Sequence, residues 1–216
     1  MKLKIDLHVH TAGSTDAFIQ LEELPLILKE RGLDGAAITN HDALAKVEAP
    51  SSEAVIIPGI EVSAREGHII GLGVSGPIAR GRPADETIFL IHSAGGVAVI
   101  PHPFDPVSPC IRPSKLRSRP DAIEVMNADA LFFGLSTIFA RQAAERLKLP
   151  MVAGSDSHIP ETVGDAYTLI DSNSKKVEDI LNAIRAGHVE PIGGSTSPTN
   201  KLLKLARTLR RLYSSS

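Results

Sequence analysis

Two Asp-x-His motifs stand near opposite ends of the chain. Asp6, His8 and His10 alternate along the first apolar run, and Asp156 and His158 follow a late one. Because side chains alternate between faces along a strand, His8 and His10 point to one side, and Asp156 and His158 likewise share a side. Two imidazoles presented in parallel from one strand end can chelate a metal ion.

Further residues of metal-ligand type lie between the two motifs, most of them where a predicted strand ends. They are His41, Asp42, Glu61, His68 and His102, of which His68 stands at the start of its strand. Imidazole combined with carboxylate suits zinc, manganese or iron better than calcium or magnesium. A single histidine is more often a core or surface residue, but this many ligand-type residues at strand ends favour a metal centre.

Bulk properties restrict the class of protein. With 216 residues, 43% of them apolar, the chain can bury one substantial core and needs no second domain. A formal charge of −2 gives no overall field for nucleic acid or membrane, so any attraction for phosphate must be local. The single cysteine, Cys110, excludes an intramolecular disulfide and is expected to be inert. With no apolar leader at the N-terminus, we expect a soluble, cytoplasmic protein.

Short β-type runs alternate with helical runs along the chain. The predicted strands span residues 3–9, 35–39, 54–57, 69–74, 97–100, 122–125, 151–153 and 167–170, and the predicted helices span 21–31, 84–94, 131–147 and 176–186. Strand followed by helix, repeated this often, predicts a parallel sheet. With roughly seven strands and no glycine-rich dinucleotide fingerprint, a closed or nearly closed barrel is favoured over an open sheet.

The composition changes after residue 190, which divides a barrel of residues 1–190 from a linker and helix in residues 191–216, part of the same domain or a tail. Residues 201–213 predict a final helix. One stripe of it is apolar: Leu202, Leu205, Leu209 and Leu212. The other side is basic: Lys201, Lys204, Arg207, Arg210 and Arg211. The simplest interpretation packs the leucines on the barrel and leaves the basic side in solvent. Contact with RNA or a partner protein is the alternative.

The strand-end motifs together resemble those of the PHP (polymerase and histidinol phosphatase) family of metal-dependent phosphoesterases. The matching segments are 6–11 (DLHVHT), 39–42 (TNHD), 58–61 (PGIE), 94–96 (AGG) with 101–103 (PHP), and 154–158 (GSDSH). The resemblance covers the chain from residue 3 to about residue 190. It implies an α/β fold, a distorted seven-stranded βα barrel of TIM-like type, with the metal site at the C-terminal strand ends.

The resemblance also implies a ligand set for three divalent ions, which could be zinc, manganese or iron. The first would be held by His8, His10, Glu61 and Asp156, the second by Glu61, His68 and His102, and the third by Asp16, His41 and His158. Glu61 could bridge two cations that would otherwise repel each other. Asp16 has an alternative role as the cap of the helix that starts near Leu21.

Four other residues near these motifs, or of the same type, have simpler interpretations. Asp6 and Asp42 could accept the second N–H of a ligating histidine, or could tie loop N–H groups at the barrel mouth. His92 lies inside a predicted helix and His188 follows a helix end, so both are expected to be structural.

The resemblance implies hydrolysis of a phosphoester by a hydroxide bridging the first two metals, with Glu61, Asp156 and His158 at the catalytic centre. The absence of a nucleophile elbow or a Cys/His dyad agrees with a reaction that needs no side-chain nucleophile. His158 or His102 could protonate the leaving oxygen only when free of metal, so the general acid stays unassigned.

Phosphate recognition favours arginine, whose planar fork binds two oxygens at once. The candidates are Arg65, Arg112, Arg117 and Arg119, although each taken singly is more often a solvated surface charge. Because the chain has no room for an inserted subdomain, we expect a small phosphate monoester, a nucleotide or the end of an oligonucleotide as substrate. No membrane contact is expected, and the oligomeric state is left open.

Two other functions remain open at this point. One is hydrolysis of a C–N bond, as in amidohydrolase barrels, although no lysine at a strand end offers a carbamylated bridge. The other is a non-catalytic barrel that binds RNA or protein and keeps its metals as structural ions. The complete ligand set argues against this second alternative, because a degenerate site would have lost some of these residues.

Overall fold

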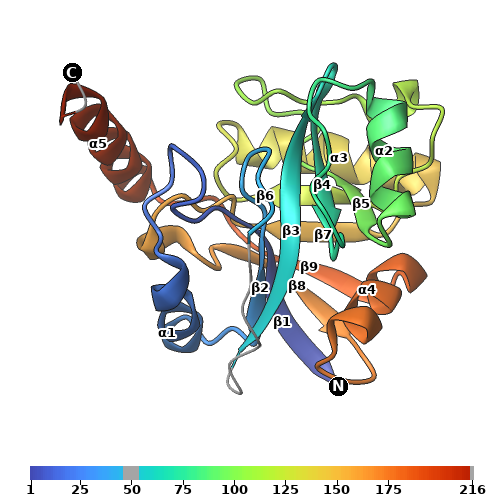
Figure 1. The fold of residues 1–216 in the computed structure, drawn as a ribbon, viewed down its shortest axis with the longest axis horizontal. Helices are drawn as coiled ribbons and strands as arrows, with labels where there is room; N and C mark the ends of the chain where they lie inside the picture. The colour runs from blue at the N-terminus through green and yellow to red at the C-terminus, as the bar shows by residue number, and fades with distance from the viewer. Residues whose placement is uncertain (46–53, 215–216) are drawn as a thin grey trace.

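The chain folds around one nine-stranded sheet, seen here in a computed structural model that describes residues 1–45 and 54–214 (Figure 1). The strands are β1 (Lys2–Val9), β2 (Gly35–Ile38), β3 (Val55–Ala64), β4 (Gly67–Leu72), β5 (Val97–Ile100), β6 (Ala122–Asn127), β7 (Met151–Gly154), β8 (Ala166–Asp171) and β9 (Val189–Gly193). Their order across the sheet is β7-β6-β5-β4-β3-β2-β1-β8-β9.

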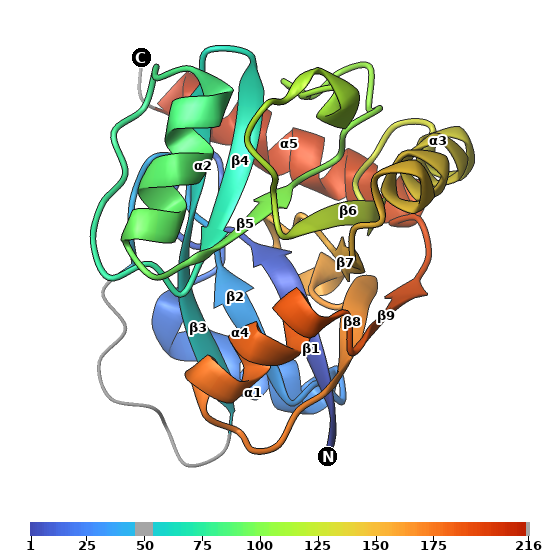
Figure 2. The same cartoon turned by 90° about the vertical axis from the view of Figure 1, so that its right-hand side faces the viewer.

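The sheet curls until β7 returns to β1 and β8. The backbone N–H of Asp156, just after β7, donates to the carbonyl of His8 at 2.8 Å. The N–H of Ala153 donates to the Thr168 hydroxyl on β8, also at 2.8 Å. The barrel is therefore nearly closed, as the strand count and the absence of a dinucleotide fingerprint predicted (Figure 2).

The prediction of a parallel sheet of about seven strands is wrong in two respects. First, β4 runs antiparallel to both β3 and β5, and β8 runs antiparallel to both β1 and β9. Only Arg65 and Glu66 separate β3 from β4, which leaves room for a hairpin and not for a crossover helix. Second, the structure contains nine strands, since β9 forms at the sheet edge, where Pro191 is tolerated.

Five helices pack around this sheet: α1 (Leu24–Glu30), α2 (Ala84–Ser93), α3 (Phe133–Leu147), α4 (Val177–Ala186) and α5 (Pro198–Ser214). Buried residues of α1 share a core cluster with β1 and β2, and those of α2 and α3 share one with β3 to β6. Ile180 and Ile184 of α4 pack with Leu3 and Ile5 of β1, so α4 covers the barrel end at which β1 begins (Figure 1). The opposite end, where β1 finishes at Val9, is left for the site.

α5 lies against the barrel by the side opposite to the predicted one. Its four stripe leucines, at positions 202, 205, 209 and 212, are 45–66% exposed. Its basic residues contact the barrel instead. Lys201 donates to the carbonyls of Asp129 and Ala130, and Arg207 forms a bidentate ion pair with Glu161. The prediction that the leucines pack on the barrel is therefore wrong, because the neighbouring loops offer carbonyls and carboxylates there.

No helix in the described residues is long and apolar enough to cross a membrane.

Candidate metal centre

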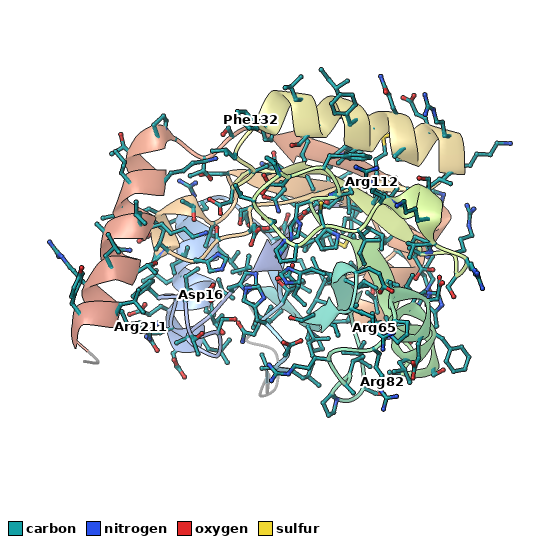
Figure 3. All side chains as sticks on the ribbon, turned by 90° about the horizontal axis from the view of Figure 1, so that it is seen from above. Asp16, Arg65, Arg82, Arg112, Phe132 and Arg211 are labelled. Carbon is teal, nitrogen blue, oxygen red and sulfur yellow. The ribbon has the colours of Figure 1, made fainter. Side chains whose placement is uncertain are left out.

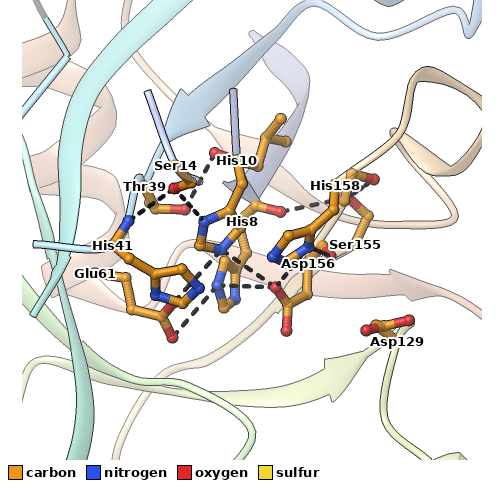
Figure 4. A network of polar contacts seen from close by, with 12 residues as sticks. His8, His10, Ser14, Thr39, His41, Glu61, Asp129, Ser155, Asp156 and His158 are labelled. Atoms are coloured by element: carbon orange, nitrogen blue, oxygen red, sulfur yellow. Dashed lines mark hydrogen bonds and ion pairs between the residues drawn. The ribbon is translucent and has the colours of Figure 1, made fainter. Parts of the chain in front are cut away.

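The nine residues predicted as ligands converge at the barrel end where β1 finishes, and Figure 4 labels six of them. They come from β1, from β3 and β4, and from the segments that follow β1, β2, β5 and β7. His68 lies among them because of a strand direction that was not predicted from the sequence. Because β4 runs antiparallel to β3, the start of β4 lies at the same end as the finish of β3, and His68 pairs with Ser63.

The carboxylate of Glu61 lies at the middle of this cluster. Its oxygens are 3.0–3.6 Å from ring nitrogens of five histidines: His8, His10, His41, His68 and His102. Burial alone would raise the pKa of Glu61, but the surrounding histidines, His8 above all, outweigh burial and hold this pKa well below its ordinary value. Glu61 is therefore an ionised, buried carboxylate that faces several imidazoles at once.

Asp156 forms a second charged group beside Glu61. Its Oδ1 is 3.4 Å from His8 Nε2 and 3.3 Å from His10 Nε2. Its Oδ2 accepts a hydrogen bond of 3.1 Å from the Asn127 amide. Burial again opposes ionisation, but the neighbouring histidines lower the pKa of Asp156 well below its usual range, with His8 contributing most.

The third group joins Asp16 to two histidines. Asp16 Oδ2 lies 3.3 Å from His158 Nε2 and 3.7 Å from His41 Nε2. The alternative in which Asp16 caps a helix is wrong, because the first helical turn is preceded by Gln20 and α1 by Glu23. Burial would raise the pKa of Asp16, but His158 and then His41 lower it.

Several buried polar atoms of the cluster lack a hydrogen-bond partner among the described residues. They are His8 Nε2, His10 Nε2, His102 Nδ1 and Asp16 Oδ1. Unsatisfied buried nitrogen and oxygen atoms are costly, so such a concentration calls for a further ligand. Ligand atoms of His8, His10 and Glu61 all lie within 4.8 Å of one another, as do those of His41, Glu61 and His68. The donor set therefore fits divalent metal ions.

Glu124 is a site residue that sequence reasoning missed. It is buried on β6, and its Oε1 lies 3.0 Å from His8 Nδ1. Its Oε2 accepts hydrogen bonds from the His102 backbone N–H and the Asn127 amide, each at 2.9 Å. The only signal in the sequence was a lone glutamate inside the apolar run of residues 122–125.

Asp6 and Asp42 differ from Glu124, because the hydrogen bonds that they accept from the described residues come from N–H and O–H groups and not from the ring of a predicted ligand. Asp6 accepts hydrogen bonds from the backbone N–H groups of His8, Ser155 and Gly164, and Asp42 accepts one from Ser63 at 2.8 Å. Burial raises the pKa of Asp6 to about 6 in spite of these bonds. The contacts favour the second of the two predicted roles, in which both residues tie loops at the barrel mouth.

Ser14 and Asn40 hold the segments that follow β1 and β2 in place beside the cluster. Sequence reasoning assigned no role to either residue, although Asn40 lies within the matching segment 39–42. The Ser14 hydroxyl lies 3.3 Å from His10 Nδ1 and accepts the His41 backbone N–H at 3.0 Å. Asn40 Oδ1 accepts the backbone N–H of Thr11 at 2.7 Å. Small polar residues of this kind are too common in loops to be recognised from a single sequence.

The backbone at the site adopts a sparsely populated conformation. Among the described residues, four that are not glycine have a positive φ, and three of these lie here: Asp42 (53°), His102 (32°) and Asp156 (55°). Each would relax in an unconstrained chain, since this region is unfavourable for side chains with a Cβ. Such strain concentrates at functional sites, where surrounding contacts hold it in place.

The four arginine candidates separate into two pairs. Arg119 donates to the carbonyls of Leu147 and Lys148 and lines a surface cavity with His92 and Arg185, which contains none of the nine predicted ligands. Arg117 bonds through its backbone to Asp85 of α2.

Arg65 and Arg112, both labelled in Figure 3, belong to segments that adjoin strands carrying predicted ligands. Arg65 follows β3 directly, and Arg112 belongs to the loop in which the Pro109 carbonyl accepts the His68 N–H at 3.0 Å. The other two histidines stay outside the site: His92 pairs with Asp121, and His188 precedes β9.

α5 reaches the site from the side through charged and polar contacts. Lys204 Nζ lies 2.6 Å from Asp129 Oδ2, and the Asp129 N–H donates to the side-chain oxygen of Asn127, whose amide donates to Asp156. Burial disfavours the charged form of Lys204, but Asp129 and then Asp156 raise its pKa. A continuous chain of contacts therefore runs from α5 to one of the central carboxylates.

Comparisons with known sequences find a family profile and relatives that match this chain. A family profile described as PHP-associated matches residues 139–189. An uncharacterized protein of Methanocaldococcus jannaschii is 31% identical over 142 residues, which cover 58% of this chain and 82% of that protein.

Solved structures share this fold, among them the following two. A two-domain protein from Bacteroides vulgatus that contains a predicted PHP-like metal-dependent phosphoesterase superposes with a TM-score of 0.66 at 17% identity, over 96% of this chain and 70% of that one. The lesion-specific endonuclease Q of Pyrococcus furiosus superposes with a TM-score of 0.64 at 17% identity, over 88% of this chain and 58% of that one. At this identity the likeness concerns the fold alone.

Proposed function

The chain belongs to the PHP family, and from this membership we propose that it hydrolyses phosphoesters with divalent metal ions held at the barrel mouth. One observation carries the proposal. The buried, ionised Glu61 faces five histidine nitrogens, and His8 Nε2 and His10 Nε2 beside it have no hydrogen-bond partner among the described residues. Such a cluster has little structural value without cations to satisfy it.

Three ions of zinc, manganese or iron account for all nine residues. We assign the first to His8, His10, Glu61 and Asp156, the second to Glu61, His68 and His102, and the third to Asp16, His41 and His158. The contacts of Asp16 with both His41 and His158 support the third group. The proximity of His41 to Glu61 and His68 would equally allow His41 a place beside the second ion, so the third group is the part most open to test.

When bound, the metal ions would lower the pKa of water towards neutrality and supply positive charge for phosphoryl oxygens. The protein residues would prepare the site for that chemistry. The carboxylates of Glu61 and Asp156 are held ionised by the histidines and can therefore neutralise adjacent cations. Glu124 accepts the Nδ1–H of His8, so that the lone pair of Nε2 is directed into the cluster.

Two serines that follow β7, Ser155 and Ser157, support a reaction in which neither of them is the nucleophile. The Ser155 hydroxyl donates to Asp6 and contacts Ser157, and the Ser157 hydroxyl accepts from Thr162. These hydroxyls are engaged in buried hydrogen bonds, and no histidine lies positioned as their general base among the described contacts. Activated water is therefore the nucleophile that we propose.

A small phosphate monoester, a nucleotide or the end of an oligonucleotide remains the proposed substrate. The fold shared with a lesion-specific endonuclease supports including nucleic acid among the candidates. Arg65 and Arg112, the two candidates in segments that adjoin ligand-carrying strands, are the arginines that we propose for contact with phosphate.

The function is tested with the purified full chain, loaded with manganese or zinc. Phosphate release is measured with p-nitrophenyl phosphate, with its bis ester, and with a panel of nucleotides and short oligonucleotides. We expect turnover of at least one class that stops on chelation and returns on adding metal. No turnover of any of these substrates with either metal would contradict the proposed activity.

A further inference from the structure

α5 presents an apolar stripe to solvent. Leu202, Leu205, Leu209 and Leu212 are 66%, 53%, 45% and 63% exposed, and Tyr213 beside them is 81% exposed. Their spacing of three, four and three residues is that of positions a and d in a heptad, the seam by which one helix packs against another. This stripe, which we call the leucine seam, extends along α5 from Leu202 to Leu212.

The opposite side of α5 is engaged with the barrel, which determines what the seam can bind. Lys201, Lys204 and Arg207 all bond to barrel residues. A helix that lies on an anionic membrane keeps its cations available to lipid headgroups around the apolar face, and these three are directed the other way. Ala206 and Thr208, which flank the seam, are uncharged and small. Neither of these two positions therefore places a charge between the seam and a second apolar helix.

The exposed area is sufficient for a dimer. With roughly 200 Å² for a large side chain, the seam with Tyr213 offers about 600 Å² of exposed apolar surface. Leu131 and Phe132, 53% and 55% exposed, adjoin the N-terminal end of α5, because Lys201 bonds to the carbonyls of Asp129 and Ala130 just before them (Figure 3). Together these residues supply about 800 Å², which is what each partner buries in an interface of standard size.

We propose that the leucine seam is the dimer interface of this protein, occupied by α5 of a second copy. A two-fold axis makes such a stripe complementary to itself, since both copies present the same leucines at the same spacing. We assign an antiparallel pairing, in which Leu202 of one copy meets Leu212 of the other. In this arrangement the helix dipoles oppose each other, and Leu131 and Phe132 of each copy cover the Tyr213 end of the other. The inference is independent of the proposed activity.

The mass of the full chain in solution tests the interface, measured by sedimentation over the micromolar range. We expect twice the chain mass of 23.0 kDa for the wild type. The double variant Leu205→Glu with Leu209→Glu should fall to the single-chain mass, because it places carboxylates across the seam. Phe89→Glu on α2 alters an equally exposed apolar residue away from the seam and should stay dimeric. Unchanged circular dichroism would show that the variants fold.

A wild type that is monomeric throughout would overturn the proposal, and so would a dimer that survives the double variant. Monomers that float with phosphatidylcholine vesicles would also overturn it, since the seam would then bind lipid. Orientation is tested in a Cys110→Ser background. Leu202→Cys with Leu212→Cys should crosslink two chains on oxidation, whereas Leu202→Cys alone should not. Crosslinking by the single cysteine would contradict the antiparallel pairing.

Discussion

His8 and Glu124 are joined by a hydrogen bond of 3.0 Å between Nδ1 and Oε1, both atoms being buried in the barrel. When the His8 ring is neutral, as a metal ligand must be, the bond fixes its tautomer, because an imidazole that donates from Nδ1 carries its lone pair on Nε2. That nitrogen faces Glu61 and Asp156. A residue that lies outside the recognisable motifs therefore sets the chemistry of a residue inside them.

Glu124→Gln should weaken metal binding without unfolding the protein. The amide keeps the shape of the side chain but loses the charge that strengthens the bond from His8, and partners of this kind contribute about 10- to 100-fold to metal affinity. Competition with a chromogenic chelator measures the affinity, and Glu178→Gln on α4 is the matched control. Wild-type affinity in Glu124→Gln would refute the role assigned to this carboxylate.

Asp16→Asn should remove one ion and leave the others. Asp16 contacts His41 and His158 but neither Glu61 nor Asp156 among the described ion pairs, so its loss affects only the third proposed group. Elemental analysis before and after dialysis gives the number of ions per chain. If the number of bound ions is unchanged, Asp16 is not a ligand and the third group consists of His41 and His158 without it.

Lys204→Met should destabilise the protein by about 1 kcal/mol, the cost of leaving the half-buried Asp129 carboxylate without its partner. Urea unfolding measures the change. Adding Asp129→Asn to Lys204→Met should recover part of the loss, since the orphaned charge is removed as well. Purely additive losses in the double variant would show that the two residues do not interact.

The attachment of α5 should weaken in acid. The ion pair with Arg207 lowers the pKa of Glu161 below its ordinary value of 4.5, so this contact stabilises the folded state above that pH and is lost as the pH falls through the lowered value. Hydrogen exchange of α5 amides at pH values from 6 to about 3 reports the loosening. Glu161→Gln should exchange faster at pH 6 and lose most of the pH dependence. The same acid response in both proteins would assign it to other groups.

The alternation of apolar and turn residues located eight of the nine strands, although β3 runs on to Ala64 instead of ending at Ile57, and it did not give their directions. Periodicity along one strand carries no information about its neighbour, and the antiparallel β4 became clear only from the two-residue connection after Ala64. The candidate site was easier to predict from the sequence, because strand ends that meet at one barrel mouth bring their motif residues together. Glu124 escaped notice since its partner, His8, is 116 residues away in sequence.

The orientation of α5 shows a different limit. Its amphipathic pattern correctly predicted a helix with one apolar and one basic side, but such a pattern does not specify which side finds a partner. The answer depends on the carbonyls of Asp129 and Ala130 and on the Glu161 carboxylate, which the fold gathers from separate loops. The same inversion leaves the leucine seam exposed.

The most direct test of the account is the metal content of Glu61→Gln. The full chain is loaded with zinc or manganese, dialysed against metal-free buffer and analysed for bound ions, beside the wild type and His92→Gln, whose histidine lies outside the site. We expect three ions per chain in the wild type and in His92→Gln. Glu61→Gln should lose the first and second ions together, because one neutral amide cannot bridge them. A wild type without bound metal, or a Glu61→Gln variant that retains the full complement, would contradict the central claim.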